Sequence, residues 1–153
     1  MSDDNQSPRD RGQHDDGEHA LVYWRVLPAN RFEAETKENL LACISRISAT
    51  SDEWGRAIRG DPAAAVSLAL YLETPSRVTY RVDLVMTMLL RAAIDNAAAA
   101  TVMAHRLNAM PLNFKKRSKL ATSWLLHCIW LGSRRRHRAS SPLRSHHEGR
   151  PRS

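Results

Sequence analysis

The chain has 153 residues, of which 42% are hydrophobic and 6% aromatic, and its formal net charge at pH 7 is +7. This length fits one domain, and the apolar share is large enough to form a hydrophobic core, which excludes a wholly disordered chain. The sequence contains no nucleotide-binding loop, no activated nucleophile and no metal-ligand spacing. We therefore predict that the protein is not an enzyme and that it holds no cofactor and no metal.

Charge is distributed unevenly along the chain. Residues 1–19 hold six acidic and two basic side chains, whereas residues 115–153 hold eleven basic side chains and one acidic one. The first segment has almost no apolar residues, so we expect a disordered acidic tail over 1–19. It lacks the apolar stretch of a secretory signal, and no later stretch is both long and apolar enough to cross a bilayer. These features predict a cytoplasmic protein without a membrane span.

The predicted helical domain covers residues 20–132. Its first stretch, ALVYWRVLP at 20–28, is rich in β-branched and aromatic residues, which predicts a short strand or an extended segment lying on the core. No second strand follows with which it could pair. Asn30, with Glu33 three residues later, then predicts the start of the first helix.

Two further helix starts follow in the sequence. Thr50 and Glu53 form a capping-box pattern for a short helix that ends at Gly60. Asp61 followed by Pro62 predicts another helix start, because a proline at the first helical position lacks only an N–H that would be unpaired anyway. The residues after Pro62 are apolar nearly all round, so we expect this helix to be buried.

The longest predicted helix runs from Pro75 to Ala109. Its apolar residues recur at alternating intervals of four and three, which resembles a coiled-coil seam with Asn96 as a polar member. We favour a core helix of a compact bundle. The alternative is a homodimer that pairs through this helix, in which Asn96 would face its twin and set the register.

The last predicted helix runs from Asn113 to Leu131, with Gly132 as its stop and a disordered basic tail over 133–153. Trp124 and Trp130 are six residues apart on it, so we expect only one of them to lie fully in the core. The predicted apolar stripe is Leu120, Trp124, Leu125, Cys128 and Leu131. Together the patterns predict an all-α protein, a single compact helical bundle of about four to five helices with one long central helix and disordered tails.

The basic end of the chain carries the functional prediction. KKRSK at 115–119 lies at a helix start, where cations oppose the helix dipole, and RRRHR at 134–138 follows the predicted helix end. Such clusters are typical of proteins that bind nucleic acid non-specifically, and an anionic membrane surface attracts them too. The alternative function is a helical homodimer whose tail has no specific role. The predicted nucleic-acid-binding residues are Lys115, Lys116, Arg117, Lys119, Arg134, Arg135, Arg136 and Arg138.

Overall fold

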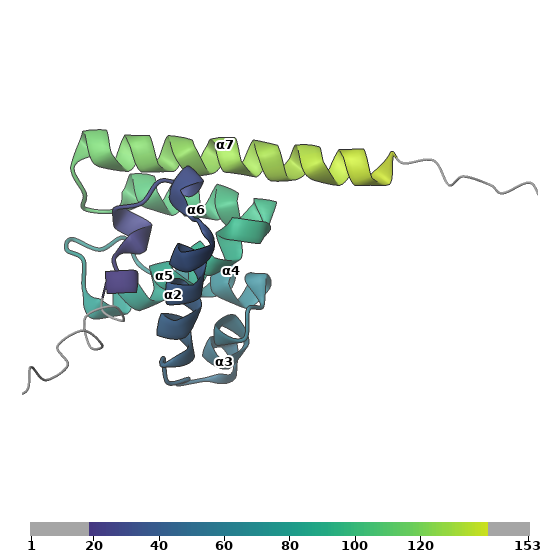
Figure 1. Cartoon of the computed structure of the whole chain (residues 1–153). Coiled ribbons are helices and arrows are strands. Elements are labelled where there is room, and N and C mark those ends of the chain that lie inside the picture. The colour runs from purple at the N-terminus through teal and green to yellow at the C-terminus, as the bar shows by residue number, and fades with distance from the viewer. Residues whose placement is uncertain (1–18, 141–153) are drawn as a thin grey trace, which may run out of the picture.

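The structure, a computed structural model, describes residues 19–140 (Figure 1). The predicted tails lie outside the described residues, except for His19 and for residues 133–140. The described residues form six α-helices and two short 3₁₀ helices and contain no strand, so the all-α prediction is confirmed with more helices than expected. The elements are η1 (Tyr23–Arg25), η2 (Ala29–Arg31), α2 (Ala34–Ser45), α3 (Asp52–Ile58), α4 (Pro62–Tyr71), α5 (Tyr80–Asp95), α6 (Ala97–Ala109) and α7 (Phe114–Ala139).

The core forms around α5 and α6. α5 packs against α2, α4, α6 and η1, and its residues from Val85 to Leu90 are all buried. A helix that is buried all round must be surrounded by others, and this packing stabilises it more than its helix propensity does. α6 packs against α4, α5 and α7, with Ala99 and Ala100 fully buried, so that neighbouring helices can approach closely.

The predicted long helix from Pro75 to Ala109 is wrong, because the chain breaks at Asn96 into α5 and α6. The backbone of Asn96 is extended, with φ −122° and ψ 119°. Its N–H donates to the carbonyl of Ala92 at 3.0 Å and thereby closes α5, while its side-chain oxygen accepts the N–H of Ala99 at 2.9 Å and opens α6. Asparagine is among the best N-cap residues, and this capping outweighs the apolar periodicity across the break. The seam that would have paired two copies through Asn96 therefore does not exist.

Of the other predicted helix starts, the one at Asp61 is confirmed, and those at Thr50 and Asn30 are wrong. Asp61 caps α4 as expected, because its carboxylate accepts the N–H groups of Ala63 and Ala64 at 3.0 and 3.4 Å. α3 is capped by Ser51 rather than by Thr50. The first helix does not start at Asn30, which lies in η2. α2 begins only after Glu33, which makes no side-chain capping bond.

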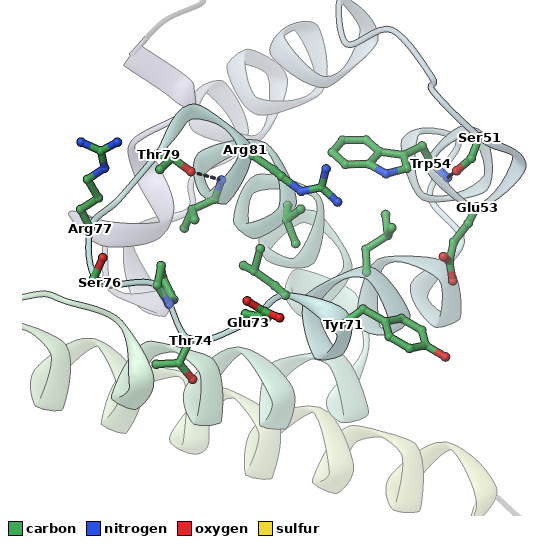
Figure 2. A pocket seen from close by; sticks show the side chains of 15 residues that line it. Ser51, Glu53, Trp54, Tyr71, Glu73, Thr74, Ser76, Arg77, Thr79 and Arg81 are labelled. Carbon is green, nitrogen blue, oxygen red and sulfur yellow. Dashed lines mark hydrogen bonds between the residues drawn. The ribbon is translucent and has the colours of Figure 1, made fainter.

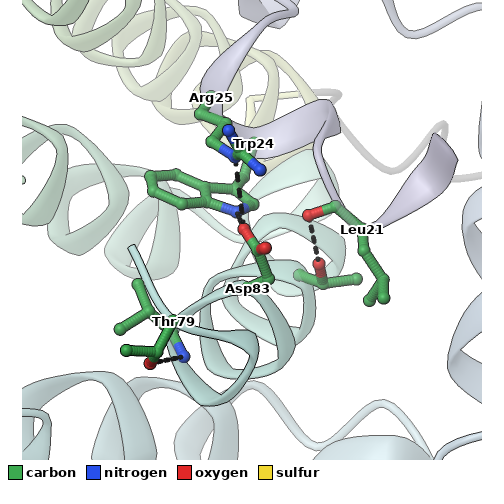
Figure 3. Close-up of polar contacts among 7 residues, drawn as sticks. Leu21, Trp24, Arg25, Thr79 and Asp83 are labelled. Atoms are coloured by element: carbon green, nitrogen blue, oxygen red, sulfur yellow. Dashed lines mark hydrogen bonds and ion pairs between the residues drawn. The ribbon is translucent and has the colours of Figure 1, made fainter. Parts of the chain in front are cut away.

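The stretch 20–28 is neither a strand nor extended, since it forms η1 and packs on α5 (Figure 3). Trp24 is fully buried, and its indole N–H donates to Asp83 Oδ1 at 2.8 Å. Arg25 Nε donates to the same oxygen at 3.3 Å. A partly buried acceptor on α5 thus fixes the position of a segment 59 residues earlier in the chain.

α7 is longer than predicted, because it continues through Gly132 to Ala139. A glycine in a helix costs only about 1 kcal/mol relative to alanine, and the arginines that follow are good helix formers. The last turns of α7 extend past the rest of the bundle (Figure 1). Residues 133–139 are therefore helical and not part of a disordered tail.

Candidate anion-binding surface on α7

All eight predicted nucleic-acid-binding residues lie on α7, a single continuous helix. Asn113 starts this helix, because its side chain accepts the N–H of Lys115 at 3.0 Å. The structure therefore places the RRRHR cluster inside the helix, whereas the sequence had placed it after the helix end. Seven of the eight side chains are exposed: Lys115, Lys116, Lys119, Arg134, Arg135, Arg136 and Arg138.

Arg117 is the exception among the eight cations, because it is half-buried. Its Nη1 donates to the carbonyl of Met110 at 3.3 Å, and its guanidinium carbon lies 5.5 Å from the centre of the Phe114 ring. These contacts hold Arg117 against the turn that precedes α7. Its role is therefore structural at least in part.

The two clusters are separated along the helix axis. At 1.5 Å per residue, the centres of KKRSK and RRRHR lie about 28 Å apart. At about 100° per residue, Lys115, Lys119 and Arg136 fall on the face opposite the buried Leu120 and Trp124. The structure thus brings cations together within each end of α7 and aligns some of them on one outer face, but it does not join the two clusters.

The charged side chains of α7 are all of one sign. The helix contains no Asp or Glu. Among residues 19–140 the ion pairs are Arg25 with Asp83 and Arg56 with Asp61, so none of the α7 cations is neutralised by a described carboxylate. The first-turn lysines also oppose the helix dipole, whereas the arginines near the C-terminus are favoured by it. An external anion would relieve the unfavourable contact of the lysines with the dipole at one end and the mutual repulsion of the clustered arginines at the other.

Exposed apolar side chains lie between the two clusters, a feature that the sequence analysis missed. Leu125, Leu126, Ile129 and Trp130, here called the α7 patch, are 47, 62, 65 and 51% exposed. Leu125 was predicted to belong to the core stripe, and that prediction is wrong. Trp124 is fully buried while Trp130 is not, as expected for the pair. The signal was present in the sequence, because residues 125, 126, 129 and 130 share a face that turns away from Trp124.

A cavity of about 780 Å³ lies between α3, the end of α4 and the start of α5 (Figure 2). Its charged side chains are two carboxylates and two guanidinium groups, so its charge favours neither an anion nor a cation. Two of its hydroxyl groups, on Ser51 and Thr79, accept backbone N–H groups and cap α3 and α5. Figure 2 shows Arg81 extending toward Trp54 across this cavity.

Within residues 19–140, no helix combines the length and apolar character that a membrane span requires. The same part of the chain has no group of three or more His, Cys, Asp or Glu side chains placed to hold a metal ion. Comparison of the chain with protein-family models, curated proteins and solved structures finds no match in any of the three.

Proposed function

We propose that this protein binds nucleic acid non-specifically through the exposed cations of α7. The observation that carries the proposal is the combination of eight cations and no carboxylate on one helix. Lysine and arginine side chains of this kind neutralise phosphates and release the counterions condensed on them. The 28 Å between the clusters corresponds to about eight base pairs at 3.4 Å per phosphate along a strand, so one duplex lying along α7 would contact both.

The α7 sequence also favours contact with phosphates over base recognition. It contains no Asn or Gln, the residues that read adenine in the major groove, and its arginines lie in a dense cluster rather than spaced along a recognition face. Phosphate contacts position a protein on nucleic acid without reading its sequence. We therefore expect similar affinities for unrelated duplexes.

The proposal is tested by fluorescence anisotropy of a labelled duplex at several salt concentrations. The logarithm of the binding constant should fall linearly with the logarithm of salt, with a slope of about −0.9 per phosphate neutralised. Replacing Lys115, Lys116 and Lys119 by alanine should remove part of the slope, and replacing the four arginines of 134–138 should remove most of the rest. Arg77→Ala, which removes an exposed cation from a loop away from α7, is the control and should leave the slope unchanged. Binding that is absent, or whose salt slope is the same in all variants, would contradict the proposal.

The α7 patch favours a second candidate partner, an anionic lipid surface. Exposed leucine, isoleucine and tryptophan beside lysine and arginine are typical of helices that lie in the interface of a bilayer. Nucleic acid would leave this patch uncovered, whereas lipid would cover it.

Co-sedimentation with vesicles distinguishes the two partners. If the partner is lipid, binding should require phosphatidylglycerol in the vesicles. The double substitution Leu125→Ser and Ile129→Ser should then abolish vesicle binding and leave DNA binding unchanged. If the double variant and the original chain bind vesicles equally, the patch has no part in lipid binding.

A further inference from the structure

A groove of about 580 Å³ runs along one side of α7, where this helix meets η2, α2 and the end of α5. We call it the α7 groove. Two hydrogen bonds hold its walls together. Ser123 Oγ accepts the N–H of Ala29 at 3.0 Å, and His127 Nε2 donates to the carbonyl of Ile94 at 2.8 Å. The volume falls within the range of about 300–1,000 Å³ that is usual for small-molecule sites.

One wall of the α7 groove is aromatic. The ring centres of Phe32, Trp124, His127 and Trp130 follow one another at 5.8, 5.4 and 5.5 Å. Trp130 remains 51% exposed at the mouth, and the neighbouring Leu126 is 62% exposed. This apolar surface is open to water, and a flat apolar molecule in the groove would cover it.

The aromatic wall does not suit a stacked nucleobase. His127 stacks on Trp130 with 29° between the ring planes, and the Arg134 guanidinium carbon lies 4.7 Å from the centre of the Trp130 ring. A base would have to displace one of these side chains in order to stack on the indole. A ligand that lies along the groove can instead contact the exposed parts of Trp130 and Leu126 and leave both side chains in place.

The charge of the α7 groove is positive. Lys37 and Arg134 line it, with Asp95 as its single carboxylate, and none of the three forms an ion pair with another described residue. Trp124, also in the lining, is fully buried, and its indole N–H has no acceptor among the described residues. A buried donor without an acceptor lowers the stability of the fold at this point.

We propose that the α7 groove binds a small anionic amphiphile, with its apolar body against Trp130 and Leu126 and its carboxylate or sulfonate held by Lys37 and Arg134. The aromatic wall selects the apolar body, and the excess of cations selects the anion over a neutral or cationic molecule. The site shares Arg134 with the proposed nucleic-acid surface. Lys37 separates the two sites, because it lies on α2 and is not one of the α7 cations.

Two fluorescent probes with the same aromatic rings test the proposal on the full chain. Anilinonaphthalene sulfonate carries a negative charge, and phenylnaphthylamine is its neutral counterpart. The sulfonate should bind one site about tenfold more tightly than the neutral probe, and decanoate should displace it. Lys37→Gln and Arg134→Gln should each weaken sulfonate binding about threefold to fivefold, as expected for exposed ion pairs, and leave neutral-probe binding unchanged.

Lys116→Gln is the matched control, because it removes an exposed α7 cation outside the groove lining and should not change binding of either probe. Equal affinity for the two probes would overturn the proposal, and so would an equal loss in the Lys116 variant. Displacement of the sulfonate by duplex DNA as effectively as by decanoate would also overturn it, because the groove would then belong to the nucleic-acid surface. Lys37→Gln should leave the salt slope of DNA binding intact, so either proposal can fail without the other.

Discussion

Arg106 is the charged side chain that residues 19–140 bury most deeply, with 7% of its surface exposed. It lies on α6, and its Nη2 donates to the carbonyl of Leu72, at the C-terminal end of α4, at 2.7 Å. Its Nε has no partner among the described residues, and burial lowers the pKa of the guanidinium below its usual value. The favourable contact with a helix C-terminus thus opposes the cost of burying an unpaired charge.

This balance predicts the effect of replacing Arg106. Arg106→Met keeps most of the side-chain volume and removes the buried charge, so the free energy of unfolding should change by less than about 1 kcal/mol. Arg106→Ala also leaves a cavity and should lower it by about 2–3 kcal/mol. Urea denaturation of both variants measures the difference. A loss of more than about 2 kcal/mol in the methionine variant would show that the bond to Leu72 is worth more than the charge costs.

The two cysteines should differ in reactivity. Cys43 is buried, and this desolvation raises the pKa of its thiol, an effect that Arg46 partly offsets. Cys128 is half-buried, with its sulfur 3.1 Å from Thr101 Oγ1. Because the thiolate is the reactive form, iodoacetamide should modify Cys43 much more slowly than an unfolded cysteine at the same pH.

Mass spectrometry of a Cys128→Ser variant follows Cys43 alone. A raised pKa in the folded state contributes stability that is present below the unfolded value of 9.0 and is lost as the pH rises above it. The free energy of unfolding should therefore fall more steeply above about pH 9 in the original chain than in a Cys43→Ala variant. Identical pH profiles would contradict this.

Asn96 decides whether the chain forms one helix or two. Asn96→Ala removes the bond to the N–H of Ala99 and should lower the free energy of unfolding by about 1 kcal/mol, the usual cost of losing an N-cap. Asn96→Asp keeps an oxygen acceptor and is the matched control. Asn96→Leu should destabilise the protein as alanine does and should not strengthen self-association, which sedimentation can check. If the leucine variant formed a more stable oligomer, the result would support the homodimer that pairs through this part of the chain.

The sequence predicted helix boundaries best where a cap is local and strong. Asp61 with Pro62, and Asn113 before α7, were read correctly because the capping residues act within three positions of themselves. The break at Asn96 was missed because the apolar residues on both sides keep helical spacing across it. That spacing reflects burial in the same core, which two helices at an angle can satisfy as well as one straight helix.

The residues of the candidate site were predicted from the sequence, but their arrangement on one continuous helix was not. The eight cations are evident from composition, whereas their placement on one helix depended on Gly132. Nothing surrounds this glycine within 4 Å of where a Cβ would lie, so no packing forces a stop there. The α7 groove could not be predicted, because it joins Lys37, Asp95 and Arg134 from three helices that only tertiary packing brings together.

Charge opposes pairing of two copies of the protein through the α7 patch. An antiparallel contact centred on residues 126–129 would place Lys119 opposite Arg136 of a second copy, and a parallel contact would place each cluster opposite itself. Like charges at such contacts are repulsive until salt screens them. The apolar patch alone is therefore insufficient to produce a dimer at low salt.

This repulsion predicts a salt dependence opposite to that of nucleic-acid binding. In sedimentation velocity the protein should be monomeric at about 0.1 M salt, and any self-association should strengthen toward about 1 M, where the screening length falls to about 3 Å. Leu125→Ser with Ile129→Ser should abolish the association at high salt. A dimer that forms at low salt and dissociates as salt rises would instead indicate pairing through opposite charges.

Two bonds join the first described segment to helices far along the chain, and we call this segment the clasp. Trp24 bonds to Asp83 on α5, 59 residues away, and Ala29 bonds to Ser123 on α7, 94 residues away. Such a clasp can close only after both helices are in place, so its contacts should be largely absent from the folding transition state. Trp24→Phe, which loses the indole N–H, should then speed unfolding about tenfold and barely change the folding rate in stopped-flow denaturant jumps. The unfolding rate, rather than the folding rate, should therefore depend on this first described segment. If the substitution instead slowed folding about tenfold and left the unfolding rate unchanged, the clasp would belong to the folding nucleus.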